Sequence, residues 1–386
     1  MRVLYRGGIA TRSSYGQVCH DYLMALHLAG VPFDVDPISD ADTENLPARY
    51  APLLDHLAPE APFAQGREYT HVIVHTDPNL PQRFLDDVPF GVKKILLTTW
   101  EADRIHKREA RIVNEYFDAL IVPARFNVDL AAQAGIDNRV YCIPHAFDPV
   151  WYDHWNMRDA KSTDTYTFYN ISTWTPRKNP LAPILAYLAE FRPDENVCFK
   201  HVTNDYKRDD ILNLMYSGAV RKAPKLEILG VPNRLTDGEM RDLHRTSDCF
   251  VTLSRGEAFN LGAFEASLAG NVVVSIGWGG AVEYLNNYPG ARFVQHFLTP
   301  VLIPPPAKKD PEADRLLDKE MGVGQGVTYG QNWAEPDIHG ARRLMREAYE
   351  SYDRTDYRAG YYDGILDRRF TYEAVGQQFK QVLESI

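Results

Sequence analysis

Two glutamates separated by seven residues, Glu257 and Glu265, are the residues of this 386-residue chain that most clearly indicate a binding or catalytic site. An apolar run that ends near Leu253 predicts a strand, and the pattern that opens near Leu261 predicts a helix. Glu257 then lies in the loop between them and Glu265 on the first turns of the helix. Because carboxylates accept hydrogen bonds from hydroxyl groups, the pair suits a ligand with hydroxyls at two ends. Solvated charges at a helix end are the alternative interpretation.

The start of the same helix is suited to a phosphate. The backbone N–H groups of Phe259, Asn260 and Leu261 are expected at the helix N-terminus, where amides lack intrahelical partners and the helix dipole is positive. A carboxylate repels a phosphate but attracts hydroxyls. A diphosphate with a polyol on either side, such as a nucleotide sugar, satisfies both conditions.

The order of residues in this segment resembles the Glu-x7-Glu region of retaining GT-B glycosyltransferases, especially glycosyltransferase family 4. That pattern is a Glu, an aromatic-Gly-Leu turn, a Glu-Ala pair, a Gly, an apolar strand and a Gly-Gly-x-x-Glu loop. Its counterparts here are Glu257, Phe259–Asn260–Leu261, Glu265–Ala266, Gly270, Val272–Ser275 and Gly279–Gly280 to Glu283. The resemblance implies that Glu257 contacts the donor sugar and Glu265 the ribose hydroxyls. Asn260 replaces the usual Gly, and Asn tolerates left-handed backbone angles better than most residues.

The segment Asn170–Pro180 lies where this family carries its diphosphate-binding basic pair. Lys178 matches the family's Lys, and the resemblance implies a catalytic role for it together with Glu257. Thr173 takes the position of the usual Arg, so Arg177 is the candidate to supply that charge. An Arg-Lys pair before a helix is otherwise interpreted as a solvated pair.

Two further segments resemble nucleotide-contacting parts of the family. Gly230 and Val231 follow the strand that binds the base, and we expect them to contact it through their backbone. Ser14 and Gly16 lie after the first strand, where the family has a glycine-containing loop that faces the diphosphate. A plain helix start explains Ser14 and Gly16 nearly as well.

The chain departs from the family pattern in the segment Leu96–Ile105, where many members present a His that touches the donor sugar. Trp100 takes that position, so either the sugar is held differently or Glu101 takes a polar role. His75 ends the preceding strand and His145 ends the first domain. Both are weaker candidates, and a structural role is the alternative for each. The acceptor class is open, although Trp100, Trp151 and Trp155 would stack on a sugar if they do not pack in the core.

We expect neither a metal nor a cofactor, with the nucleotide sugar as co-substrate. Asp34-x-Asp36 and Asp40-x-Asp42 mimic the metal-binding Asp-x-Asp of the other major glycosyltransferase fold. Their place beside the second predicted strand favours a solvated strand end instead. No Gly-x-Gly-x-x-Gly follows Tyr5, which counts against an NAD-dependent dehydrogenase.

Short β-branched runs alternate with helical patterns, which is typical of parallel α/β architecture. In the first half the predicted strands are Arg2–Tyr5, Phe33–Val35, His71–His75, Lys94–Thr98, Ala119–Val122 and Val140–Ile143, and the predicted helices are Gln17–Ala29, Arg104–Phe117 and Asn127–Ala134. In the second half the predicted strands are Tyr166–Ser172, Val197–Val202, Leu226–Leu229, Cys249–Leu253 and Val272–Ile276. The predicted helices there are Pro180–Phe191, Asp209–Tyr216, Asp237–His244, Leu261–Ala269, Asp337–Tyr352 and Tyr372–Ser385, and residues 297–335 read as an irregular insertion.

The expected fold is therefore α/β, with two Rossmann-like domains that face each other across a cleft, the GT-B fold. The resemblance implies that residues 1–150 form the N-terminal acceptor domain and residues 151–370 the donor domain. The resemblance implies that the helix in 371–386 crosses back to the N-terminal domain.

The composition, 45% hydrophobic and 24% charged, is that of an ordinary globular protein. The net charge of −10 makes a nucleic-acid partner or a polybasic membrane anchor unlikely. We expect no transmembrane segment, because no apolar run approaches the roughly 20 residues that span a bilayer. The four scattered cysteines fit reduced, buried thiols, and the N-terminus lacks the features of a signal peptide, so we expect a cytoplasmic location.

The sequence thus predicts a retaining glycosyltransferase of the hexosyltransferase type. It would move a sugar from a UDP- or GDP-sugar to a hydroxyl of a glycan, lipid-linked, protein or small-molecule acceptor. A GT-B epimerase or phosphorylase, or a non-catalytic nucleotide-sugar-binding protein, are the alternatives.

Overall fold

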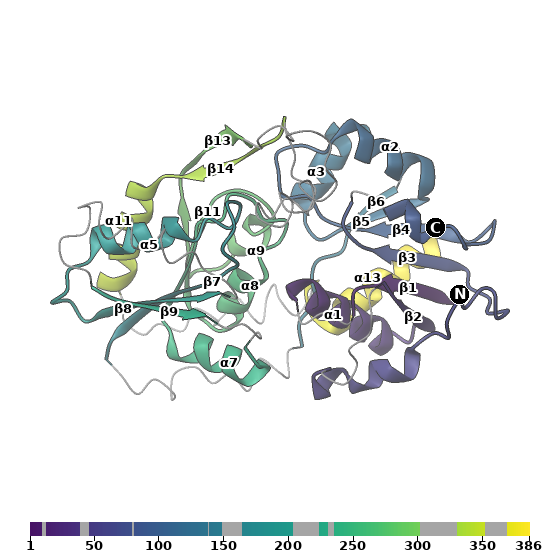
Figure 1. Ribbon diagram of the computed structural model, residues 1–386, viewed down its shortest axis with the longest axis horizontal. Helices are drawn as coiled ribbons and strands as arrows, with labels where there is room; N and C mark the ends of the chain where they lie inside the picture. The colour runs from purple at the N-terminus through teal and green to yellow at the C-terminus, as the bar shows by residue number, and fades with distance from the viewer. Residues whose placement is uncertain are drawn as a thin grey trace. The chain divides into compact units, whose positions relative to one another are not determined.

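The computed structural model describes residues 1–9, 13–38, 46–78, 81–137, 139–148, 164–203, 224–230, 235–301, 330–351 and 369–386. The chain divides into two compact units, Met1–Pro149 with Gly364–Ile386, and Val150–Asp363 (Figure 1). Each unit is built on a six-stranded parallel sheet flanked by helices. The predicted class, α/β with two Rossmann-like units, is confirmed.

The first unit has the strand order β2-β1-β3-β4-β5-β6. Its strands are β1 (Val3–Gly7), β2 (Phe33–Pro37), β3 (His71–His75), β4 (Lys93–Leu97), β5 (Ala119–Val122) and β6 (Arg139–Cys142). Its helices are α1 (Ser14–Leu28), α2 (Lys107–Tyr116), α3 (Arg125–Gln133) and α13 (Tyr372–Ser385), with short 3-10 helices η2 (Ala48–His56) and η3 (Pro81–Phe84). The central strands β1, β3 and β5 are fully buried, as continuous apolar runs covered on both faces must be.

Helix α13 belongs to the first unit, where it packs against α1 (Figure 1). Gly376 makes this close approach possible, because a Cβ there would collide with the carbonyl oxygen of Ala25. The last helix of the chain therefore returns to the sheet formed by the first residues.

The second unit has the strand order β12-β11-β10-β7-β8-β9. Its strands are β7 (Tyr166–Ile171), β8 (Val197–Thr203), β9 (Lys225–Gly230), β10 (Cys249–Thr252), β11 (Val272–Ile276) and β12 (Ala291–Val294). Its helices are α5 (Leu181–Glu190), α7 (Asp237–Thr246), α8 (Leu261–Leu268), α9 (Val282–Leu285) and α11 (Ile338–Glu350). Strands β13 (His296–Pro300) and β14 (Asn332–Pro336) pair antiparallel beside this sheet.

The structure confirms the predicted elements that it describes, within a few residues at each end. Helix α7 begins with a capping box, in which Thr236 Oγ1 accepts from the Glu239 amide and the Glu239 side chain accepts from the Thr236 amide. The prediction of an irregular insertion over 297–335 is wrong at its two ends, which form β13 and β14. The predicted helix Asp209–Tyr216 lies outside the described residues.

Candidate functional site

The loop that joins β10 to α8 carries the predicted donor-binding residues. Asn260 caps α8 with a left-handed backbone, at φ 67° and ψ 75°. Its side-chain oxygen accepts from the Ala263 amide at 3.3 Å, and its amide nitrogen donates to Thr252 Oγ1 at 3.2 Å. The position that the family fills with Gly thus requires a left-handed residue, and Asn satisfies that requirement while adding a helix cap.

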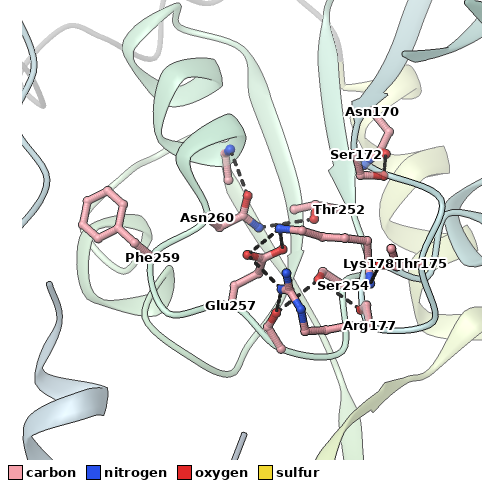
Figure 2. Close-up of polar contacts among 12 residues, drawn as sticks. Asn170, Ser172, Thr175, Arg177, Lys178, Thr252, Ser254, Glu257, Phe259 and Asn260 are labelled. Carbon is pink, nitrogen blue, oxygen red and sulfur yellow. Dashed lines mark hydrogen bonds and ion pairs between the residues drawn. The ribbon is translucent and has the colours of Figure 1, made fainter. Parts of the chain in front are cut away.

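Glu257 and Lys178 form a direct ion pair, drawn at the centre of Figure 2. Lys178 Nζ lies 2.7 Å from Glu257 Oε1 and 2.9 Å from Oε2. Arg177 Nη1 lies 3.6 Å from Glu257 Oε2 and donates to the Gly256 carbonyl oxygen at 2.7 Å. The two residues assigned catalytic roles therefore touch, although 79 positions separate them in the chain.

The charges of this cluster set the protonation state of Glu257, whose residue is 8% exposed. Burial alone would raise the pKa of the Glu257 carboxyl, but the attraction of Lys178 and then of Arg177 outweighs it and holds the pKa below the usual value. Glu257 is therefore ionised at neutral pH. Two cations around one carboxylate leave a net positive charge, which suits a phosphate.

Backbone and side-chain bonds hold the basic pair against the loop of Glu257 (Figure 2). The Arg255 amide donates to the Arg177 carbonyl oxygen at 2.8 Å, and the Ser254 hydroxyl donates to the same oxygen at 3.2 Å. Asn179, at φ 49°, donates from its side chain to the Leu253 carbonyl oxygen at 3.2 Å. The turn before α5 and the loop before α8 thus form one rigid assembly.

Glu265 lies on α8 with its residue 7% exposed. Its Oε2 is 3.7 Å from Nε2 of His244, a residue of α7 that is fully buried. The structure therefore does not support the alternative in which Glu257 and Glu265 are solvated charges at a helix end.

The remaining predicted residues of the second unit differ in exposure, and one of them lies outside the described residues. Thr173 is exposed in the turn that follows β7. Gly230 is exposed at the end of β9, and Val231 lies outside the described residues. Phe259 is buried, whereas Leu261 at the start of α8 is partly exposed.

In the first unit, Ser14 and Gly16 form the first turn of α1. Ser13 is the N-cap, and its hydroxyl accepts from the Gly16 amide at 3.0 Å. Ser14 is exposed. This geometry is that of the plain helix start given above as the alternative, because the Gly16 amide already has a partner.

Trp100 has no exposed surface. Its indole N–H donates to Glu109 Oε2 at 2.9 Å, and its carbonyl oxygen accepts from the Asn127 side chain at 2.7 Å. A ring without exposed surface has no face on which a sugar can stack, so the core-packing interpretation of Trp100 fits this structure. Trp151 and Trp155 lie outside the described residues.

Glu101 is buried, and the Nδ1 atom of His145 is buried although part of that residue is exposed. Burial lowers the pKa of His145 to about 3, so its imidazole is neutral at physiological pH. His75 is buried at the end of β3, with Nδ1 2.5 Å from the Tyr5 hydroxyl, and burial lowers its pKa to about 3 as well. Neither histidine therefore offers a positive charge that could bind a phosphate.

The interpretation as a solvated strand end is wrong for Asp34, which is buried, whereas Asp36 is partly exposed in β2. Asp34 binds Arg2 at 2.8 Å and accepts from the Tyr69 hydroxyl at 2.7 Å, while Asp36 binds the buried Arg6 at 2.8 Å. Asp40 and Asp42 lie outside the described residues. Among the residues that the structure describes, no three His, Cys, Asp or Glu side chains are placed to hold a metal ion.

Sequence reasoning missed several residues that build the site. Ser254 and Asn179 brace the basic pair, Tyr284 supports the loop of Glu257, and His244 faces Glu265. The Gly-Gly-x-x-Glu part of the motif pointed to the region of Gly279, whereas His244 gave no signal in the sequence.

The four cysteines are free thiols, as predicted, and Cys142 is the one that is partly exposed. No helix of the described part of the chain is long and apolar enough to cross a membrane.

Solved structures of low sequence identity share the fold of the whole chain. Sucrose-phosphate synthase from Thermosynechococcus elongatus matches with a TM-score of 0.62 at 13% identity, covering 100% of this chain and 98% of that one. A glycosyltransferase from Rickettsia africae ESF-5 matches with a TM-score of 0.60 at 12% identity, covering 100% and 98%. The E. coli protein described as trehalose-6-phosphate, bound with UDP-2-fluoro glucose, matches with a TM-score of 0.56 at 12% identity, covering 100% and 99%.

No protein-family model and no curated protein sequence matches the chain. At these identities the structural matches establish the fold, which is the two-unit α/β fold of GT-B proteins. Activity has to be argued from the site itself.

Proposed function

We propose that this protein is a retaining glycosyltransferase that moves a sugar from a nucleoside diphosphate sugar to a hydroxyl. The observation that carries the proposal is the buried carboxylate of Glu257, ion-paired with Lys178 and flanked by Arg177 next to the start of α8. Buried charges are costly unless they are paired, so a cluster with excess positive charge in an α/β loop favours an anionic ligand. The sugar-bearing UDP in one matched structure agrees with this ligand class.

The chemical difficulty in this reaction is the negative charge that develops on the departing diphosphate. Lys178 and Arg177 meet that charge from fixed positions, which is the usual way in which proteins stabilise such a transition state. Glu257 then accepts hydrogen bonds from hydroxyls of the donor sugar, and Glu265 from those of the ribose. A phosphate oxygen of the leaving group takes the acceptor proton on the same face, so no separate protein base is needed.

The donor should be identified first. UDP-, GDP- and ADP-sugars are tested for an increase in the melting temperature, because a ligand that binds the native state raises its apparent stability. The stabilising donor is then incubated with alcohols and sugars, and the anomeric configuration of any product is read by nuclear magnetic resonance. Activity that survives EDTA supports the expected independence from metal ions, because the protein cations replace a divalent ion.

The roles of Lys178 and Glu257 are tested by Lys178→Ala and Glu257→Ala. Each is expected to lower turnover by about 10²–10³-fold, the usual effect of removing one preorganised group. The matched control is Lys225→Ala, which removes an exposed lysine of the same unit that is paired with Glu227. Near-normal turnover in both site variants would contradict the proposal.

The two alternative functions give different products. An epimerase would return an altered donor without an acceptor, and a phosphorylase would need inorganic phosphate. A non-catalytic binding protein would be stabilised by a donor but would neither transfer nor slowly hydrolyse its sugar.

A further inference from the structure

A row of buried polar side chains in the second unit leads to Glu265. Asn271 Nδ2 donates to the hydroxyl oxygen of Tyr169 at 2.8 Å and to the carbonyl oxygen of His244 at 2.9 Å. The same Tyr169 hydroxyl lies 2.6 Å from His244 Nδ1. On the other side of the imidazole ring, His244 Nε2 lies 3.7 Å from Glu265 Oε2.

These four residues come from separate elements and are all buried. Tyr169 is on β7, His244 on α7 and Glu265 on α8, while Asn271 lies between α8 and β11. Tyr169 and His244 have no exposed surface, and Asn271 and Glu265 are each 7% exposed. Because a buried polar group without a partner is costly, the direction of each hydrogen bond in the row is constrained.

The row has one consistent direction. Asn271 faces a backbone carbonyl, which can only accept, so the nitrogen of its amide must point there and towards Tyr169. The Tyr169 oxygen accepts from Asn271, which directs its own hydrogen to His244 Nδ1. Because Nδ1 accepts this hydrogen bond, Nε2 carries a ring proton, and Nε2 is the nitrogen that faces Glu265. The opposite tautomer would set a lone pair against a carboxylate.

We propose that His244 is a positioning residue that holds the Glu265 carboxylate in the orientation that binds the ribose hydroxyls of the donor. The inference rests on the proposed function, in which Glu265 makes that contact. A separation of 3.7 Å is longer than a formed hydrogen bond. The proposal therefore requires the two atoms to come closer in the donor complex, as hydrogen bonds in active sites often do. Asn271 and Tyr169 act through His244 by fixing its tautomer.

The test measures how strongly the protein prefers a nucleotide with ribose hydroxyls over the analogue that lacks the 2′ and 3′ hydroxyls. Dissociation constants are measured by calorimetry for UDP, GDP and ADP, each against its 2′,3′-dideoxy analogue. The wild-type protein should prefer the ribose form of its nucleotide by at least about tenfold, as expected for hydrogen bonds to a charged group. His244→Phe and Tyr169→Phe should each reduce that preference by about threefold or more, with the affinity for the dideoxy analogue unchanged.

His244→Gln keeps a donor near the position of Nε2 and should restore part of the preference. The matched control is Tyr187→Phe, which removes another tyrosine hydroxyl of the same unit that donates to the Lys225 carbonyl oxygen at 2.8 Å. This control should lose stability without a change in discrimination. If His244→Phe does not fold, the comparison of Tyr169→Phe and His244→Gln with the wild type provides the test.

Failure of this inference is distinguishable from failure of the proposed function. If the wild-type protein binds none of UDP, GDP and ADP, the proposed function is wrong and so is the role of His244. If the wild-type protein discriminates and the variants discriminate equally well, the role of His244 alone is wrong. Equal loss of affinity for both forms of the nucleotide would show a purely structural effect and would also overturn it.

Discussion

The backbone at Gly279 lies so close to Glu257 that a Cβ on residue 279 would come within 2.6 Å of the Glu257 carbonyl oxygen. That oxygen also accepts from the Gly280 amide at 2.9 Å. Gly279 also has φ of 85°, a conformation that favours glycine. A larger residue at this position would therefore meet both backbone strain and a collision. The glycine pair therefore fixes the backbone of the residue that pairs with Lys178.

Gly279→Ala is accordingly expected to displace Glu257 and to lower turnover by about tenfold or more, since small displacements at a reacting centre are costly. Turnover and the melting temperature are measured together. The matched control is Gly330→Ala, which has φ of 91° but no atom within 4 Å of the added Cβ. The control carries the backbone strain, about 1–2 kcal/mol, without the collision. Equal activity of the two variants would show that the contact with Glu257 is not needed.

Two substitutions of Asn260 test whether its left-handed backbone or its helix cap contributes more to stability. Asn260→Gly keeps the backbone conformation and costs a few tenths of a kcal/mol as a cap, so it should unfold at nearly the wild-type urea concentration. Asn260→Ala loses the cap on Ala263 and adds left-handed strain, and together these should cost about 2–3 kcal/mol. If the two variants were equally stable, the φ of residue 260 would not be a constraint.

The sequence predicted the sheets well because their signal is local. Strands such as β3 and β11 are apolar and rich in β-branched residues, and their bounds agree with the prediction. Strands β13 and β14 were missed because each lies at an end of a segment rich in Pro and Gly and needs a partner across that segment, with His296 paired to Pro336. Pairing of that kind depends on the fold rather than on local preference.

Part of the candidate site was predicted because its sequence motif is local as well, and the rest was missed because it depends on the fold. Glu257 and Lys178 were identified by motif, but no sequence pattern gives the contact between residues 79 positions apart. The two interpretations of Trp100, stacking or packing, were equal in the sequence because a Trp serves both. Its burial and its bond to Glu109 depend on how α2 packs. His244 was missed because its role comes from Tyr169 and Asn271, which lie on other elements.

Trp100→Phe separates packing from sugar recognition. The variant loses the bond to Glu109 and some volume in a fully buried position, so we expect the free energy of unfolding to fall by about 1–3 kcal/mol. The KM values for donor and acceptor should change by less than about twofold, because a ring without exposed surface contacts neither substrate. Loss of a substrate contact would raise KM. A raised acceptor KM with normal stability would instead establish a stacking role.

Glu109 gives the first unit a pH-dependent stability. Burial raises the pKa of its carboxyl from 4.5 to about 7, against the smaller effects of the hydrogen bonds from the Trp100 indole and the His106 amide. Because the folded pKa is above the unfolded value, the folded state keeps a proton that the unfolded state releases. The stability due to Glu109 is therefore fully present below about pH 4.5 and is lost as the pH rises through about 7.

Glu109→Gln should remove this dependence, because its amide oxygen can still accept from Trp100 and His106 and it does not ionise. Relative to wild type, the variant should gain stability on going from about pH 5 to about pH 8, up to about 3 kcal/mol. Urea unfolding followed by circular dichroism at both pH values measures the gain. The matched control is Glu115→Gln on the same helix, whose side chain is 54% exposed and pairs with Arg111. Parallel curves for Glu109→Gln and wild type would mean that Glu109 is already ionised in the folded protein, and the Trp100 indole would then donate to a buried carboxylate.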